Sequence, residues 1–260
     1  MTFIKLARRA LVPSALICFV LLAPQASAQS VERDYLPFAE SRLRRFPLKR
    51  TELTREGLMS EGGVNVSGVK IREEEEPGAR GGAAGAEEED AARFLVFSGR
   101  DLGGREWRVT TGTGVYYEAV YEGDLDRNGQ RDLVVSIGTG GNGLAPPTRL
   151  VFLTFDRARR PTLFNATGYF ESRPGDIFDV TDFDGDGRAE LLYMNYGDGY
   201  WITNLYRMRD SRWSRVEGRF AGLNFPLYTR FTRRPNHRPV RPARGRNPVA
   251  PDLIKENAER

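Results

Sequence analysis

The sequence has very little of the side-chain chemistry that most enzymes use. Its 260 residues include one cysteine, Cys18, and one histidine, His237. A catalytic triad or a Cys-His site needs a histidine beside its nucleophile, and a structural zinc site is usually built from several cysteines and histidines. The sequence also contains no phosphate-binding loop or dinucleotide-binding fingerprint. We therefore expect a protein that is not an enzyme of these classes.

Long apolar runs are also scarce. The run near the N-terminus extends from Leu11 to Leu22, which is too short for a comfortable membrane span. Basic residues precede this run and the sequence Ala26-Ser27-Ala28 follows it, which is the order of segments in a secretory signal peptide. We predict that residues 1–28 are such a signal. The mature chain is then secreted, or lies in the periplasm or cell envelope, and has no transmembrane span.

The single cysteine, Cys18, lies inside this predicted signal, so the mature chain has none. A lipoprotein signal requires a small residue directly before its cysteine, and Ile17 at that position argues against lipid attachment. Disulfides would persist in an exported protein, but this mature chain cannot form them. We therefore expect burial and bound metal to hold the fold together.

Charge is distributed unevenly along the chain. The formal net charge of +4 includes three basic residues of the predicted signal, which leaves the mature chain near +1. Residues 73–92 are acidic, rich in glycine and alanine, and without a large apolar side chain. Such a segment buries too little apolar area to offset its conformational entropy. We predict that it is a disordered linker.

The C-terminal residues 233–260 are predicted to form an Arg/Pro-rich tail. Seven arginines lie close together with prolines between them: Arg230, Arg233, Arg234, Arg238, Arg241, Arg244 and Arg246. Interleaved prolines favour an extended chain, so we expect this tail to be mobile. Its candidate partners are an anionic glycan, a membrane surface or the acidic linker, and a tail with no partner is the alternative. Nucleic acid is not expected, because the protein is predicted to be exported.

Aromatic residues are concentrated between the linker and the tail, where 23 of the 28 lie between Phe94 and Phe231. We predict one β-domain over residues 93–232. Short apolar runs separated by turn residues indicate strands at 94–98, 106–110, 115–121, 133–138, 149–155, 177–180, 191–196, 200–208 and 212–217. For residues 29–72 we expect short helices and a strand over 64–71.

Two nine-residue stretches in this β-domain share one pattern and begin 58 residues apart. Loop one is Asp124–Asp132, loop two is Asp182–Glu190, and both read D-x-D-x-[D/N]-G-x-x-[D/E]. Oxygen-bearing side chains at positions 1, 3, 5 and 9 suit calcium, which takes about six to eight oxygen ligands. Glycine at position 6 permits a sharp turn. The predicted ligands are Asp124, Asp126, Asn128 and Asp132 in loop one, Asp182, Asp184, Asp186 and Glu190 in loop two, and the backbone carbonyls of Gln130 and Arg188.

The two loops differ in charge. Loop two has four carboxylates, whereas loop one has three because Asn128 is neutral. Charge count tunes calcium affinity, so we expect loop two to bind calcium more tightly. An ordinary hairpin turn is the alternative for either loop, since Asp, Asn and Gly all favour turns. Two copies, each followed by a predicted strand, favour metal binding.

An EF-hand does not fit these loops. It requires a bidentate Glu at position 12 and a helix on each side, but position 12 is Val135 or Tyr193 and the flanks indicate strands. The pattern resembles the FG-GAP/VCBS repeat of integrin α chains and of many exported bacterial proteins. The resemblance rests on the ligand positions, the loop glycines, and Leu133 and Leu191 after the loops, and it covers roughly residues 93–220.

The resemblance implies an all-β fold of short antiparallel strands in two blade-like repeats. These repeats form either a partial β-propeller or a compact two-repeat domain, and the length of residues 93–232 favours the second. It also implies two bound Ca²⁺ ions and a non-enzymatic binding or adhesion module at the cell envelope, with a glycan or an envelope protein as its partner. Two alternatives remain open: a secreted calcium-dependent polysaccharide hydrolase or lyase, and a purely structural envelope protein.

The predicted signal gives a first test. We expect the mature chain to begin at Gln29, because Ala26-Ser27-Ala28 provides the small residues that signal peptidase requires. Intact-mass spectrometry of the exported protein measures this directly. An exported species that retains Cys18, with or without lipid, would contradict the prediction.

Overall fold

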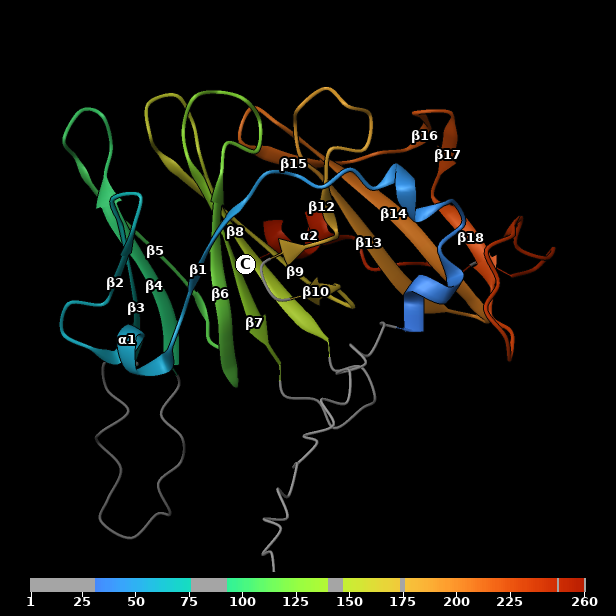
Figure 1. The fold of residues 1–260 in the computed structure, drawn as a ribbon, viewed down its shortest axis with the longest axis horizontal. Helices are drawn as coiled ribbons and strands as arrows, with labels where there is room; N and C mark the ends of the chain where they lie inside the picture. Colours follow the sequence, from blue (N-terminus) through green and yellow to red (C-terminus); the bar gives the residue numbers. More distant parts are fainter. Residues whose placement is uncertain (1–30, 76–92, 140–146, 174–175, 247, 260) are drawn as a thin grey trace, which may run out of the picture.

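The computed structural model describes residues 31–75, 93–139, 147–173, 176–246 and 248–259. The predicted signal peptide and most of the predicted linker lie outside these ranges. Among the described residues, no helix has both the length and the apolar character needed to cross a membrane. The fold is mostly antiparallel β-structure (Figure 1), which confirms the all-β class that the sequence predicts.

Three sheets follow one another along the molecule (Figure 1). The N-terminal sheet contains β2 (Val64–Val66), β3 (Val69–Glu75), β4 (Arg93–Arg100) and β5 (Glu106–Gly112). The central sheet has the order β1–β6–β7–β8–β9, with β1 (Lys49–Glu52), β6 (Tyr116–Gly123), β7 (Asp132–Gly138), β8 (Thr148–Phe155) and β9 (Pro161–Gly168). The C-terminal sheet has the order β12–β13–β14–β18–β19, with β15 paired to β14. Its strands are β12 (Val180–Thr181), β13 (Glu190–Gly197), β14 (Tyr200–Arg209), β15 (Arg212–Arg215), β18 (Leu227–Arg230) and β19 (Pro239–Val240).

Short elements complete the fold. The helices are η1 (Val31–Tyr35), η2 (Glu40–Arg42), α1 (Arg55–Met59) and α2 (Leu253–Ala258). Two small hairpins are β10 (Ser172–Arg173) with β11 (Asp176–Ile177), and β16 (Gly218–Phe220) with β17 (Leu223–Phe225). Three of these helices lie in the segment where the sequence predicts short helices. The strand predicted over 64–71 is a hairpin instead, because Ser67 and Gly68 have positive φ values of 50° and 76° and form its turn.

The central sheet is covered on both faces, as β7 shows. All its residues are buried. Leu133, Val135 and Ile137 belong to the core shared with the N-terminal sheet, whereas Val134 belongs to the core shared with the C-terminal sheet. Side chains alternate across a strand, so a strand covered on both faces reads as a continuous apolar run.

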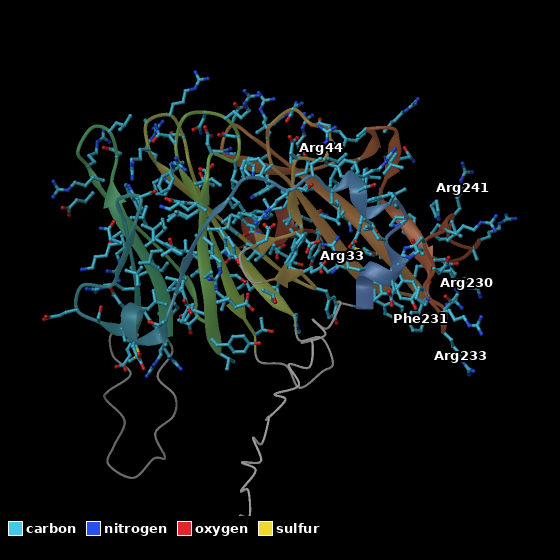
Figure 2. The ribbon with its side chains drawn as sticks, viewed as in Figure 1. Arg33, Arg44, Arg230, Phe231, Arg233 and Arg241 are labelled. Atoms are coloured by element: carbon cyan, nitrogen blue, oxygen red, sulfur yellow. The ribbon has the colours of Figure 1, made fainter. Side chains whose placement is uncertain are left out.

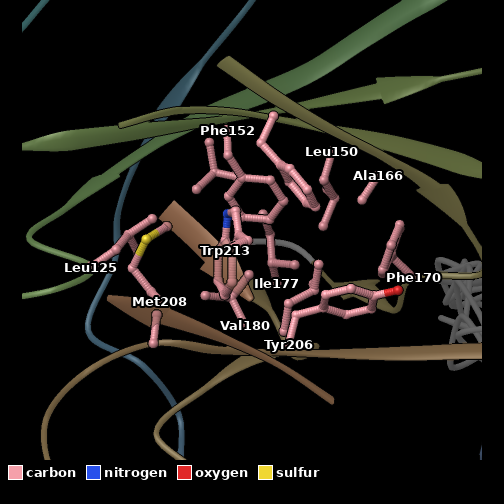
Figure 3. Packing of buried hydrophobic residues seen from close by; sticks show 14 of the residues in the cluster. Leu125, Leu150, Phe152, Ala166, Phe170, Ile177, Val180, Tyr206, Met208 and Trp213 are labelled. Atoms are coloured by element: carbon pink, nitrogen blue, oxygen red, sulfur yellow. The ribbon is translucent and has the colours of Figure 1, made fainter. Parts of the chain in front are cut away.

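The core between the central and C-terminal sheets is rich in aromatic rings (Figure 3). Phe152 of β8 meets Trp213 of β15 edge to face, with ring centroids 4.9 Å apart. Phe164 of β9 lies 6.1 Å from the same Trp213. Such pairs add about 0.5–1.5 kcal/mol beyond the burial of their area. This packing holds the two sheets face to face, so the loops at their shared edge come together.

A third core lies on the outer face of the C-terminal sheet, under η1, η2 and the β16–β17 hairpin. Arg33 of η1 is buried there and forms ion pairs with Glu171 (2.8 Å) and Asp179 (2.9 Å). Breaking a buried ion pair leaves an uncompensated charge and costs several kcal/mol. The N-terminal segment is therefore an integral layer of the fold.

The structure corrects the predicted start of the linker. Glu73–Glu75 belong to β3, which pairs with β4 along its length. Glu73 is buried and accepts hydrogen bonds from Arg55 (3.1 Å) and Arg93 (3.2 Å). These arginines neutralise Glu73, which the acidic composition of residues 73–92 places in a disordered linker. A third sheet, which the two-repeat prediction does not include, results from this pairing.

The predicted tail is also corrected, because its described residues pack on the body. Residues 239–240 form β19 against β18, and Leu253 of α2 is fully buried in the core between the central and C-terminal sheets. Asn257 holds α2 in place through hydrogen bonds with the backbone N–H (2.6 Å) and carbonyl (2.8 Å) of Asn165. Two apolar residues near the end of the segment, Leu253 and the partly buried Ile254, pack into this core. The overall Arg/Pro composition of the segment does not indicate this packing.

Leu253→Ala tests this packing. We expect the free energy of unfolding to fall by about 2–4 kcal/mol, since the substitution leaves a cavity in a dense core. Val249→Ala is the control, because Val249 is 72% exposed and its truncation should change stability by less than about 0.5 kcal/mol. Urea unfolding of both variants gives the two values. Equal stability of Leu253→Ala and the wild type would contradict this packing and mean that residues 248–259 form a loose tail.

Candidate metal centre

Loop one connects β6 to β7 and folds around its own carboxylates. Asp124 accepts hydrogen bonds from the backbone N–H groups of Asn128 (3.0 Å) and Gly129 (2.9 Å). Asp132, at the other end of the loop, accepts one from the N–H of Leu125 at 2.8 Å. Carboxylates that bind nearby N–H groups draw a short chain into a tight turn. The predicted ligands at positions 1 and 9 are thereby brought together.

Loop two, between β12 and β13, repeats this conformation. Three hydrogen bonds recur at equivalent positions: from the N–H of position 2 to the side chain of position 9, from position 5 to position 3, and from position 7 to position 5. In loop one they join Leu125 to Asp132 (2.8 Å), Asn128 to Asp126 (3.2 Å) and Gln130 to Asn128 (2.7 Å). In loop two they join Phe183 to Glu190 (2.8 Å), Asp186 to Asp184 (3.1 Å) and Arg188 to Asp186 (2.8 Å).

Backbone angles confirm that the two loops are alike. Gly129 and Gly187 at position 6 have φ values of 90° and 79°, which a residue with a side chain adopts only under strain. Position 4 is also left-handed in both, with Arg127 at 61° and Gly185 at 80°. The sequence predicts the turn at position 6 but contains no signal at Arg127. Gln130 and Arg188 use their N–H groups inside the loop, and their carbonyls remain predicted ligands.

Each loop gathers three carboxylates into one cluster. One oxygen from each member lies within 4.8 Å of the others, for Asp124, Asp126 and Asp132 in loop one and for Asp182, Asp184 and Glu190 in loop two. Oxygen atoms at this spacing fit a hard divalent cation such as Ca²⁺. In loop two, one oxygen of Asp182 and one of Glu190 are buried without a hydrogen-bond partner among the described residues. A bound cation would satisfy both.

Asn128 at position 5 is explained by its neighbours. Its Nδ2 donates hydrogen bonds to the Phe155 carbonyl (2.7 Å) and to the Ser211 hydroxyl (3.1 Å). An aspartate there would place an oxygen against the carbonyl oxygen and repel it. The amide therefore orients Oδ1 toward the loop, where it accepts the Gln130 N–H. Loop one therefore has one negatively charged ligand fewer, and Asn128 instead bonds loop one to β8.

The carboxylates at position 9 are deeply buried. Burial raises the pKa of Asp132 to about 7, against the lowering effect of the Phe155 and Leu125 N–H groups. Burial likewise raises the pKa of Glu190 to about 8, while the Phe183 N–H lowers it. In both loops the neighbouring carboxylates raise the pKa further. A divalent cation would favour the charged forms of these acids and relieve their repulsion.

The loops differ in the cations that the protein itself provides, because two guanidinium groups pair with loop two, and that of Arg188 lies 3.2 Å from Asp186. Arg207 of β14 reaches loop two, where its guanidinium lies 2.8 Å from Asp186, 3.2 Å from Asp184 and 3.6 Å from Glu190. It also stacks over the Phe220 ring at 5.0 Å. The guanidinium thus neutralises part of loop two but leaves two buried oxygens without hydrogen bonds.

Loop one has no such arginine, because threonine occupies the equivalent place. Glu190 is opposite Arg207 in the β13–β14 pair, and the pairing of Leu133 with Leu153 in β7–β8 places Thr154 opposite Asp132. Thr154 donates its hydroxyl to the Ser211 carbonyl at 2.7 Å. The ranking by charge count omits this guanidinium. Counting Arg207 and Arg188 against its four carboxylates leaves loop two less negative than loop one, so we now expect loop one to bind calcium more tightly.

The two loops also contact each other at the junction of the central and C-terminal sheets. The Ala189 N–H donates to the Leu125 carbonyl at 2.7 Å. Arg127 donates to the Asp186 carbonyl at 2.9 Å. Arg44, labelled in Figure 2, accepts the Asp182 N–H at 3.0 Å with its carbonyl. Both candidate sites are therefore parts of one connected edge.

A cavity of about 730 Å³ adjoins loop one. Arginines dominate its lining, and three aspartates contribute: Asp126, Arg127, Asn128, Asp156, Arg157, Ala158, Arg160, Arg188, Arg209, Asp210 and Ser211. The Arg160 N–H and guanidinium hold Asp156 and lower its pKa. This cationic cavity fits an anionic group better than a substrate that must be protonated.

No protein-family model, curated protein or solved structure matches this chain.

Sequence reasoning missed Arg207 and Ser211, although one signal for Arg207 was present. Asp198 and Gly199 have positive φ values of 51° and 84° and form a two-residue turn between β13 and β14. An Asp-Gly pair predicts such a turn. Counting outward from it places position 207 opposite Glu190. No comparable signal points to Ser211, which reaches loop one through sheet packing.

Arg207→Gln tests the role of the guanidinium. We expect loop two to bind calcium roughly tenfold more tightly or better, because the guanidinium that lies 2.8–3.6 Å from three of its carboxylates repels a second cation. Calorimetric titration with CaCl₂ measures the affinity, and adding Asp182→Asn should remove the gained site. Arg212→Gln, an exposed arginine outside both loops, is the charge control. Unchanged or weaker calcium binding by Arg207→Gln would refute the competition.

Proposed function

We propose that this chain is an exported, non-enzymatic calcium-binding β protein of the FG-GAP/VCBS type, which acts as a binding module at the cell envelope. The observation that supports it most is the repetition of one loop conformation with three convergent carboxylates in each copy. A hairpin turn alone needs neither acidic residues at alternate positions nor a buried carboxylate at position 9. Calcium in extracellular modules commonly has such a structural role.

In this proposal calcium acts as a staple. Asp124, Asp126 and Asp132 hold the ion in loop one, with Oδ1 of Asn128 and the Gln130 carbonyl completing the ligands. Two of these residues already join separate parts of the fold. Asp126 accepts the Ser211 N–H at 2.7 Å, and Asp132 accepts the Phe155 N–H at 2.8 Å. Neutralising their charge would tighten the edge where the two sheets meet.

The stacking of the sheets also supports a propeller-like arrangement. Each sheet contains four consecutive strands joined as antiparallel neighbours, namely β2–β5, β6–β9 and β12–β15. In this proposal, the three sheets are successive blades of an open stack. Loops one and two then occupy the same place in the second and third blades.

The hydrolase alternative receives no support from the cavity beside loop one. A glycosidase acid needs a raised pKa, and the Asp156 carboxyl in this cavity has a lowered one. Arginines are the main side chains of the lining. We therefore retain binding as the proposed function.

Calcium-dependent melting of position-1 variants tests this function. At calcium about tenfold above its dissociation constant, one site adds roughly 1.4 kcal/mol, which raises Tm by about 3–6 °C for a chain of this size. We expect Asp124→Asn to lose most of this shift and its matched partner Asp182→Asn to retain most of it. Calorimetric scans with calcium and with EGTA give the values.

Two outcomes would contradict parts of this account. Identical melting of the wild type with calcium and with EGTA would overturn the metal assignment of both loops. A larger loss for Asp182→Asn than for Asp124→Asn would restore the ranking by charge count alone.

A further inference from the structure

The end of the molecule around β18 and β19 carries a concentrated positive charge that calcium binding does not use. Figure 2 shows Arg230, Phe231, Arg233 and Arg241 gathered there. We call this surface the arginine face and define it by Arg230, Arg233, Arg238, Arg241, Tyr196 and Phe231. All four arginines are exposed. Residues 218–251 contain no Asp or Glu.

The charges of the arginine face are not neutralised within the described part of the chain. None of its four arginines forms an ion pair there. Arg246 is the contrast, since it pairs with Asp198 at 2.6 Å. Arg246 therefore has an acidic partner, whereas the four arginines of the arginine face have none among the described residues. Unpaired guanidinium groups are free to bind an oxyanion with two parallel hydrogen bonds.

Two exposed rings lie among these arginines. Tyr196 is 53% exposed and Phe231 is 48% exposed, and their ring centroids are 5.5 Å apart. Both rest on buried rings, because Tyr196 lies 5.7 Å from Trp201 and Phe231 lies 5.5 Å from Tyr35. The rings are thus held firmly while one side of each remains open to a ligand.

The backbone that carries the face is also anchored. The Tyr35 hydroxyl donates to the Thr232 carbonyl at 2.5 Å, and the Asn236 N–H donates to the Asp34 carbonyl at 2.8 Å. Asn236 further donates from its side chain to the Arg230 carbonyl at 2.9 Å. A surface ordered before it binds loses less conformational entropy on binding. The segment is therefore better suited to recognition than the mobile tail that its composition predicts.

We propose that the arginine face binds an acidic polysaccharide. Guanidinium forks match the carboxylate or sulfate groups of such a polymer, and the exposed faces of Tyr196 and Phe231 suit the apolar faces of its sugar rings. An alternative explanation is that Arg and Pro protect an exposed sheet edge from pairing with another strand. That explanation accounts for the composition around β19, but not for the exposed aromatic rings beside it. The proposal rests on the proposed binding role at the envelope, but not on calcium in either loop.

Spacing favours this polymer over a nucleic acid. Arg238 and Arg241 flank the two-residue strand β19, so three residue steps separate their Cα atoms by roughly 9–10 Å. Phosphates follow one another at about 3.4 Å per strand, whereas a polysaccharide with acidic groups on alternate rings is less densely charged. The acidic segment of the chain itself is a poor occupant, because β3 and β4, which flank it, lie at the opposite end of the molecule (Figure 1).

Biolayer interferometry of the mature chain tests the proposal. The immobilised probes are polygalacturonate, dextran sulfate, neutral dextran, oligothymidylate and vesicles containing phosphatidylglycerol. We expect binding to polygalacturonate, to dextran sulfate or to both, and none to neutral dextran. The two acidic probes separate carboxylate from sulfate recognition. Tighter binding to oligothymidylate or to the vesicles than to either acidic polysaccharide would overturn the proposal.

Matched variants locate the surface. Arg233→Gln, Arg238→Gln and Arg241→Gln together should weaken polysaccharide binding about tenfold or more, as the loss of three exposed ion pairs predicts. The control combines Arg100→Gln, Arg105→Gln and Arg212→Gln, exposed arginines outside both loops and the arginine face; these remove the same charge elsewhere and should change binding by no more than about twofold. Equal weakening by both triple variants would mean that binding reflects net charge alone, against the proposal.

The rings and calcium complete the test. Tyr196→Ser with Phe231→Ser should weaken binding about fivefold, and Tyr116→Ser, an exposed ring on β6, should not. An unaltered affinity for the double variant would remove the rings from the site and contradict the proposal. Polysaccharide binding that persists in EGTA, in a protein whose melting responds to calcium, matches the separation of the two sites. Binding without any calcium-dependent melting would support the arginine face while refuting the calcium staple.

Discussion

The bond between the Asp126 carboxylate and the backbone N–H of Ser211 ties the two larger sheets together. Asp126 belongs to the loop that leaves the central sheet, and Ser211 belongs to the turn between two strands of the C-terminal sheet. Both residues are buried, so losing one partner would leave a desolvated polar group. The aromatic core brings the sheets face to face, and this bond aligns their edges. The position of both acidic loops depends on that alignment.

Alignment of the edges creates an electrostatic problem, because it concentrates carboxylates where water is scarce. The two loops resolve it differently. Loop two pairs with the guanidinium of Arg207 from β14, which is part of the chain and always charged. Loop one has Thr154 in that place, and no guanidinium among the described residues forms an ion pair with its three clustered carboxylates. The same backbone conformation therefore combines a loop that is already partly neutralised with one whose carboxylates have no paired cation, and calcium fills that role in the function we propose.

Periodicity and turn chemistry made the loops and most strands predictable. Asp-Gly patterns indicate the local backbone conformation of a turn, and the continuous apolar run of β7 indicates a strand that is buried on both faces of its sheet. The third sheet and the packed C-terminal segment were not predictable in this way, because each depends on partners distant in sequence. Glu73 becomes a strand residue through Arg55 and Arg93, and α2 packs through Leu253. The average composition of a segment does not indicate the contacts that single residues such as Glu73 and Leu253 make.

The arginine face and the metal loops are connected through the N-terminal segment. Arg33 pairs with Asp179, which directly precedes β12 and loop two, while its neighbours in η1 bind the backbone of residues 232–236. Breaking this buried ion pair would leave an uncompensated charge, so the pair fixes η1 against the C-terminal sheet. Arg33 thus sets where the arginine face lies relative to the C-terminal sheet, whatever occupies loop two. The order of the proposed binding surface then follows from an ion pair within the chain, whereas calcium, in the function we propose, acts on the stability of the whole fold.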